Sequence, residues 1–284
     1  MKDTINEVHD NFMSQKEQTY KNSNTDVSTK PEILEQGDIF FFYRPKVRSE
    51  QVRGIEDIRR FFMVLAPDEE QELGKIYRLF VIGKKSLPEI RESEARSSER
   101  YWARVGGIFE DPKELANNLQ SDEFRKGDAA RPVGEGKYAI IKHRDHAELA
   151  YILELPKEPG EAQKELGIEK EASYIITVIN PNKPAPKGYP SAEESPTYPD
   201  SVLKEFSANE DFIPLSKNLK LIDYQNAQII LIGSREGRDV IKNEMAIEIE
   251  ENENQQEQTA EIFTKLKIQR DKVPTKPLIE GKLE

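Results

Sequence analysis

Residues 37–45 read Gly37-Asp38-Ile39-Phe40-Phe41-Phe42-Tyr43-Arg44-Pro45, and this stretch is the strongest indication of how the chain folds. The Gly-Asp pair is typical of a turn, five large apolar residues follow without a break, and the proline ends strand pairing. Side chains alternate between the two faces of a strand, so an unbroken apolar run presents apolar groups to both faces. We therefore expect a strand inside a sheet that is covered on each side.

Strand and helix signals continue along the chain, with consecutive strands early and most of the helices late. Strands are expected at residues 60–65, 77–82, 101–105, 138–142, 147–155, 174–179 and 228–232. Short helices are expected at residues 111–119, 161–166, 200–206 and 235–245, where Asp111, Gly167 and Ser234 supply the end signals. This order predicts an α+β domain with a mainly antiparallel or mixed β-sheet of about eight strands and about four short helices.

The two ends of the chain differ in composition from its middle. Residues 1–34 and the acidic linker 246–258 contain many charged and amide side chains and few apolar ones, which predicts disorder. Between them we expect a single globular domain, residues 35–245, with a proline-rich loop at 180–199. Residues 259–284 are expected to form a C-terminal tail.

Composition and charge exclude several classes of protein. The 284 residues include no cysteine, which excludes disulfides, a thiolate metal site and a thiol nucleophile. The net charge of −11 argues against bulk electrostatic attraction to nucleic acid. The first residues lack the apolar region of a signal peptide, and no apolar run approaches the roughly 20 residues that a membrane helix needs. We expect a cytoplasmic protein that does not associate with a membrane.

Positive charges and aromatic rings are concentrated between residues 40 and 104. Residues 40–60 carry 6 positive and 3 negative side chains, and residues 75–104 carry 8 and 4. Aromatic rings that stack on bases, beside cations that bind phosphates, are typical of single-strand binding. The candidate ligand-binding residues of this basic-aromatic block are Arg44, Arg60, Arg78 and Trp102. The alternative is that the rings belong to the core and the cations pair with neighbouring carboxylates.

A fifth candidate for ligand binding is Arg131, which opens the segment Arg131-Pro132-Val133-Gly134-Glu135-Gly136. The two glycines would let backbone amides approach an anion, and the guanidinium would pair with a carboxylate or phosphate. The alternative is a plain connection that needs unusual backbone dihedral angles.

The segment His143-Arg144-Asp145-His146 places two of the three histidines at the turn of an expected hairpin. Both imidazoles can face one ion there, and Asp145 or Glu148 can add an oxygen ligand. The same residues are candidates for acid–base catalysis, and the simplest interpretation is a solvated polar turn. Because only two imidazoles are available, we expect no tight metal site and no cofactor. The chain contains no Walker loop, dinucleotide-binding fingerprint or Gly-x-Ser-x-Gly elbow.

Residues 37–45, 59–65, 130–138 and 149–156 resemble a group of bacterial and archaeal proteins of unknown function. The resemblance covers residues 35–245, implies one folded unit and implies no catalytic residues. The shorter stretch 37–43 is similar to a strand of PUA-like and EVE domains, which are small barrels that hold a nucleotide or a modified base. The order of Gly37, Glu50, Arg60 and Leu65 is also similar to the small barrel of MazF-like toxin ribonucleases.

Three functions remain open at this point. The favoured one is a non-enzymatic binding protein whose ligand is a nucleotide, a short single-stranded RNA or a partner protein. The second is a hydrolase-like enzyme that uses His143, Asp145 and His146. The third is a protein-interaction module that acts through its acidic tail and proline-rich loop. We therefore lean towards a protein that is not an enzyme.

Overall fold

The computed structural model describes residues 32–46, 51–68, 76–90, 100–120, 129–184, 194–235, 237–238, 240–241 and 260–284. Residues 32–284 belong to one compact unit, so the C-terminal residues are part of the same unit as the sheet. The disorder expected for residues 1–34 and 246–258 falls on residues outside the described ones, as does the middle of the proline-rich loop, except that residues 32–34 belong to a strand in this structure. None of the helices in the described part has the length and apolar character needed to cross a membrane.

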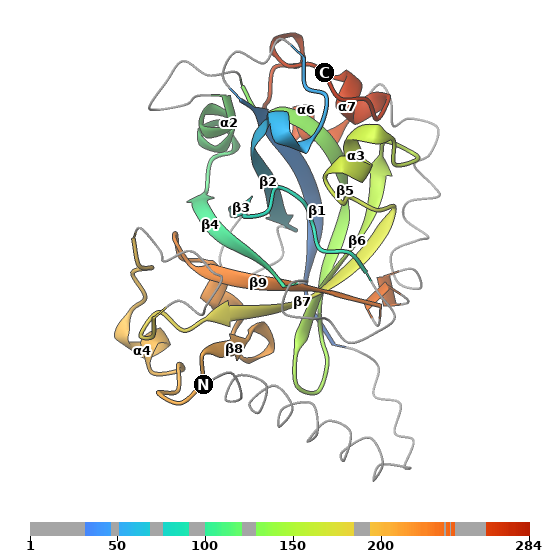
Figure 1. The fold of residues 1–284 in the computed structure, drawn as a ribbon. Coiled ribbons are helices and arrows are strands. Elements are labelled where there is room, and N and C mark those ends of the chain that lie inside the picture. The colour runs from blue at the N-terminus through green and yellow to red at the C-terminus, as the bar shows by residue number, and fades with distance from the viewer. Residues whose placement is uncertain are drawn as a thin grey trace. The chain divides into compact units, whose positions relative to one another are not determined.

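The described strands form one antiparallel sheet that closes into a barrel (Figure 1). The strands are β1 (Glu32–Pro45), β2 (Ile58–Pro67), β3 (Tyr77–Ile82), β4 (Tyr101–Phe109), β5 (Arg131–Lys142), β6 (Ala147–Leu155), β7 (Glu171–Ile179), β8 (Phe212–Pro214) and β9 (Gln228–Ser234). Their order is β6-β5-β1-β2-β3-β4-β9-β7-β8, and an additional pairing of β6 with β7 closes the first eight strands of this order. The expected mainly antiparallel sheet of about eight strands is confirmed, whereas its closure was not predicted.

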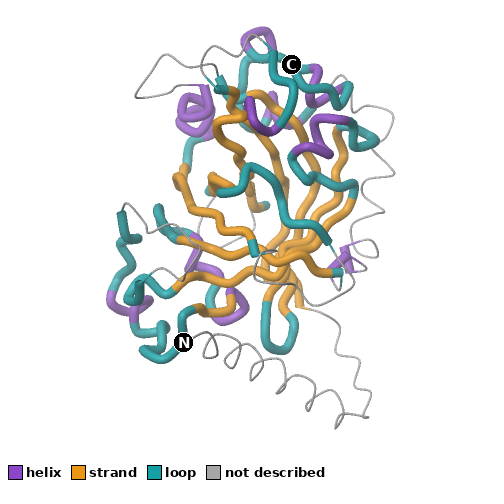
Figure 2. Tube along the Cα trace, viewed as in Figure 1, coloured by secondary structure: helices purple, strands orange, loops and turns teal. Residues whose placement is uncertain are grey.

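Short helices lie at the periphery of the sheet, most of them between strands, while the last two α-helices follow the last strand (Figure 2). They are α2 (Pro112–Gln120), α3 (Glu161–Glu165), α4 (Asp200–Leu203), α6 (Glu261–Thr264) and α7 (Lys276–Ile279), with the 3₁₀ turns η1 (Ile55–Asp57), η3 (Leu215–Lys217), η4 (Leu219–Ile222) and η5 (Arg270–Lys272). Two predicted helix ends are confirmed. The Asp111 carboxylate accepts a hydrogen bond from the Lys113 N–H at 2.8 Å, and Gly167 adopts a φ of +66° beyond α3. The fold is predominantly β, because the helices are too short to form a layer of their own.

Strand β1 is covered on both faces, as its sequence predicted. Phe41 and Tyr43 point into the barrel and belong to the core inside it. Phe40 and Phe42 point outward and belong to a second apolar cluster on the outer face of the sheet. All four side chains are fully buried. Burial of each such side chain contributes roughly 1.5–3 kcal/mol, so β1 contributes to the stability of both layers.

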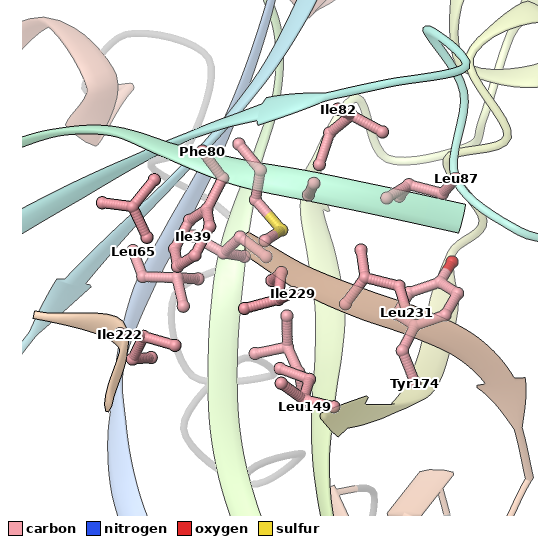
Figure 3. Close-up of a cluster of buried hydrophobic side chains, with 14 of the residues drawn as sticks. Ile39, Leu65, Phe80, Ile82, Leu87, Leu149, Tyr174, Ile222, Ile229 and Leu231 are labelled. Carbon is pink, nitrogen blue, oxygen red and sulfur yellow. The ribbon is translucent and has the colours of Figure 1, made fainter. Parts of the chain in front are cut away.

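The interior of the barrel is filled by side chains. A barrel of eight strands encloses a space that is just wide enough for this. Ile39, Leu65, Phe80 and Ile229 meet there from different strands (Figure 3). The barrel interior is thus a packed core.

The C-terminal residues form the outer cover of β1 and β5. Ile262, Leu266 and Leu278 are fully buried in the outer apolar cluster together with residues of β1. The Glu135 carboxylate of β5 accepts hydrogen bonds from the backbone N–H groups of Glu261, at 3.1 Å, and Ile262, at 2.8 Å. The segment expected to be a tail is therefore packed on the sheet in this structure.

Candidate functional site

The β5–β6 hairpin brings two histidines and a buried carboxylate together. Residues 143–148 are called the histidine hairpin below. Residues 143–146 form its turn and connect Lys142 to Ala147, the last pair of the two strands. The His143 N–H donates a hydrogen bond to the His146 carbonyl at 2.9 Å, which tightens the turn. The two imidazole rings consequently stack, with centroids 4.8 Å apart and planes inclined by 15°. The predicted hairpin and the proximity of its histidines are confirmed.

His146 lies between two carboxylates. Its Nδ1 is 2.8 Å from Asp145 Oδ1, and its Nε2 is 3.0 Å from Glu148 Oε1. Burial by itself would lower the pKa of His146, but the hydrogen bonds to Glu148 and Asp145 outweigh it and raise the pKa above its usual value. With both ring nitrogens directed at carboxylates, the protonated ring is the favoured form.

Glu148 is the centre of the site and is 0% exposed. Its Oε2 accepts hydrogen bonds from Ser173 Oγ at 2.5 Å and from the Gly237 N–H at 2.8 Å. Its Oε1 accepts one from Ser234 Oγ at 2.7 Å besides the contact with His146. Burial would raise the pKa of Glu148, but the hydrogen bonds from His146, Ser173 and Ser234 lower it to about 2.

The partners of Glu148 come from three separate elements. Ser173 lies on β7 and Ser234 on β9, where the two residues are paired across the strands. Gly237 belongs to a helical stretch formed by Gly237, Arg238, Val240 and Ile241, called the Gly237 helix below. Ser234 was expected to cap a helix. It instead ends strand β9, and its hydroxyl donates to Glu148.

Two imidazoles and one buried carboxylate converge at the histidine hairpin. One ligand atom from each of His143, His146 and Glu148 lies within 4.8 Å of the others. His143 Nε2 is buried and has no hydrogen-bond partner among the residues that the structure describes. The donor set therefore includes one nitrogen whose hydrogen-bonding capacity is not used within this part of the chain.

Two of the expected ligand-binding arginines are buried. Arg44 is 4% exposed, and its guanidinium donates to the carbonyls of Asn118, at 3.1 Å, and Leu119, at 2.8 Å, at the end of α2. Arg78 is 1% exposed and pairs with Glu35 and Asp223, each at 2.6 Å. Burial opposes the charge of Arg78, but these two carboxylates outweigh it and raise its pKa. Both arginines are used in contacts within the protein.

The other three candidates lie in different surroundings. Arg60 is exposed on β2 and is paired in register with Arg44 across the strands. Trp102 is half-buried on β4 and contacts Gly83, since a Cβ added to that glycine would lie 2.0 Å from the indole. Arg131 is mostly buried, with its guanidinium 6.0 Å from the centre of the Tyr43 ring. The structure brings Arg44 beside Arg60, and it places Arg78 at the other end of the sheet.

Ser173 and Gly237 were not expected from the sequence to be parts of a site, and Ser234 was interpreted as a helix cap. A local signal for Glu148 itself was present. Glu148 is an acidic residue between apolar neighbours in a strand, Ala147-Glu148-Leu149-Ala150, and a buried carboxylate requires partners. The identity of those partners depends on strand pairings that no local pattern specifies. No protein-family model, no curated protein and no solved structure matches the chain.

Proposed function

We propose that the protein is a non-enzymatic binding protein for a divalent transition-metal ion of the zinc class. The ligands are one ring nitrogen each of His143 and His146 and one carboxylate oxygen of Glu148. The observation that carries the proposal is the convergence of these three donors within 4.8 Å. Imidazole nitrogens with a single carboxylate suit zinc and its neighbours, whereas calcium and magnesium prefer oxygen ligands throughout.

The ligand geometry requires one modest rearrangement. Zinc binds nitrogen and oxygen at about 2.0–2.2 Å, so its tetrahedral donors are about 3.3–3.6 Å apart. His146 Nε2 and Glu148 Oε1 are already 3.0 Å apart. The remaining movement falls to the His143 ring, which must rotate out of its stack with His146. This rotation breaks no hydrogen bond of Nε2 within the described residues.

The surroundings of the donors support the same assignment. Histidine ligands usually donate their second ring N–H to a carboxylate, which fixes the tautomer and the ring orientation. Asp145 Oδ1 is 2.8 Å from His146 Nδ1 and fits this role. Ser173 and the Gly237 N–H occupy Glu148 Oε2, which leaves Oε1 as the oxygen that faces the imidazole. Glu148 would therefore bind the ion through one oxygen.

This proposal revises the expectation of no tight metal site. That expectation rested on the small number of imidazoles and treated Glu148 as one optional oxygen ligand at a solvated turn. In the structure Glu148 is fully buried, and its low pKa keeps it charged at neutral pH. A fixed anion beside two imidazoles lowers the free energy of a bound dication.

The geometry supports catalysis by these residues less well. Nucleophilic catalysis needs a hydroxyl that donates to a sufficiently strong base, but the Ser173 and Ser234 hydroxyls both donate to the Glu148 carboxylate, whose low pKa makes it a weak base. A nucleotide or single-stranded RNA at the basic-aromatic block is also less well supported, because Arg44 and Arg78 are already used internally.

Calorimetric titration of EDTA-treated, untagged protein with Zn²⁺ tests the proposed function. We expect one ion per chain in the wild type and loss of that site in His143→Ala and His146→Ala. The matched control is His9→Ala, because His9 is the one remaining histidine of the sequence. The proposal is overturned if the wild type binds no zinc, if binding survives either hairpin substitution undiminished, or if the control loses as much affinity as the hairpin variants.

A further inference from the structure

The proposed metal site is physically connected to the Gly237 helix through the two oxygens of one carboxylate. Glu148 Oε1 faces His146, while Oε2 accepts the Gly237 N–H at 2.8 Å. The glycine approaches so closely that a Cβ at position 237 would lie 2.4 Å from Ser173 Oγ and 2.7 Å from Glu148 Oε2. The start of the helix is thus in direct contact with a metal ligand.

The rest of the Gly237 helix packs on a small apolar patch of the barrel. Ile241 is almost fully buried in a cluster with Ala139 and Ile141 of β5 and Ala150 and Ile152 of β6. These strands are the two that carry the histidine hairpin. The carboxylate contact and the apolar patch therefore attach the helix to the same hairpin.

Building on the proposed function, we infer that metal binding at the histidine hairpin and packing of the Gly237 helix on the barrel stabilise each other. The helix N–H and Ser173 hold Oε2, and this fixes the direction of Oε1 towards the imidazoles. When the helix separates from the barrel, Glu148 loses the hydrogen bond from the Gly237 N–H. Its carboxylate then has more rotational freedom, so it binds metal less well. A ligand that prefers one of two states shifts the equilibrium towards that state.

Reciprocity follows from thermodynamic linkage. If the packed helix raises the metal affinity by a given factor, the metal raises the equilibrium constant for packing by the same factor. Couplings of this kind typically amount to about fivefold to 150-fold. The metal site is accordingly a regulatory site, at which the concentration of free metal ion determines how firmly the Gly237 helix is held.

Hydrogen exchange of the full chain with and without Zn²⁺ tests this inference. We expect zinc to slow exchange in the peptide that contains the Gly237 helix by about fivefold or more, and EDTA to reverse the change. The peptide that contains α6 and α7, which cover a different part of the sheet, should be unaffected. Zinc that binds but leaves the Gly237 helix unchanged, or slows both peptides equally, overturns the coupling and leaves the metal site intact. Failure of zinc to bind removes both the coupling and the proposed function.

Two variants test the reciprocal direction without altering a metal donor. Ile241→Val weakens the apolar contact of the helix and should lower zinc affinity severalfold. Leu278→Val makes a similar change in a fully buried residue of α7 and should leave zinc affinity unchanged. Each substitution removes a single carbon atom, so both variants should keep the fold. Equal affinities in the wild type and Ile241→Val, or equal losses in the two variants, contradict the inference.

Discussion

Two buried carboxylates of this protein have opposite protonation behaviour, and their donors explain the difference. Glu148 accepts hydrogen bonds from two hydroxyls, one backbone N–H and an imidazole, and its pKa falls to about 2. Among the described residues, Glu135 accepts hydrogen bonds from two backbone N–H groups, those of Glu261 and Ile262. Burial outweighs these bonds and raises its pKa to about 7. The number and charge of the donors decide whether a buried carboxylate stays ionised.

The raised pKa of Glu135 predicts a pH dependence of stability. An acid whose pKa is higher in the folded state binds protons more tightly when folded, so the free energy of unfolding falls as pH rises. The fall attributed to Glu135 lies between the usual pKa of a glutamate, 4.5, and its raised pKa of about 7. Glu135→Gln mimics the protonated form and should flatten this part of the curve. Urea titrations of the wild type and Glu135→Gln across this pH range measure the free energy of unfolding. The assignment is contradicted if the free energy falls equally with pH in the two proteins.

Phe41 and Phe42 are expected to contribute equally to the free energy of unfolding although they face opposite layers. Each is fully buried, one inside the barrel and one under the outer cover. Substitution of either by Ala should lower the free energy of unfolding by roughly 3–5 kcal/mol. Phe109→Ala, at a partly buried position of the outer cluster, is the control and should cost less. If the denaturation midpoint of Phe41→Ala or Phe42→Ala equals that of the wild type, the packing described for β1 is contradicted.

At the scale of elements, the strand ends are shaped by close contacts that local sequence does not reveal. Gly83 follows β3, and its N–H donates to the Trp102 carbonyl of β4 at 2.9 Å. The Trp102 indole lies over this glycine, where a Cβ would be 2.0 Å from the ring. An aromatic residue at a strand end was interpreted from sequence as a ligand platform. In the structure, its ring also packs against a neighbouring strand end.

The contact between Gly83 and Trp102 gives a simple spectroscopic prediction. Trp102 is the single tryptophan of the chain, so its emission reports on this contact alone. Gly83→Ala should displace the indole towards solvent and shift its fluorescence maximum to longer wavelength. Gly54→Ala is a suitable control, because the atoms nearest to its added Cβ belong to the carboxylate of Glu56. An unchanged spectrum in Gly83→Ala would show that the ring does not lie over the glycine.

At the scale of the whole molecule, local patterns predicted the elements, and long-range pairings determined how they assemble. The β5–β6 hairpin and the cap at Asp111 follow from signals within a few residues, and both were predicted. Closure of the barrel requires β7 to pair with both β6 and β9. Such pairings are determined by tertiary packing, which a single strand sequence does not encode. The same pairings bring Ser173 and Ser234 to Glu148, which is why the histidines and Glu148 were identified from the sequence and the hydroxyls that hold Glu148 were not.

The outer cover formed by the C-terminal residues should be essential for stability. Deletion of residues 260–284 uncovers Phe40 and Phe42 and removes the fully buried Ile262, Leu266 and Leu278. At about 1.5–3 kcal/mol for each buried side chain, the loss is comparable with the total stability of a typical domain. We expect a lower melting temperature and binding of a hydrophobic dye, both reversed by the same residues added as a peptide. A truncated protein that melts like the full chain would contradict this role.

The central claim is that His143, His146 and Glu148 bind one metal ion together. Anomalous diffraction at the zinc edge, from crystals of the zinc-loaded protein, tests it most directly. We predict one peak on the histidine hairpin, about 2.0–2.2 Å from a nitrogen of each imidazole and from a Glu148 oxygen. We also expect the two rings to be rotated out of the stack that they form without metal. A hairpin without a peak and with its imidazoles still stacked, in crystals that contain zinc, would contradict the account.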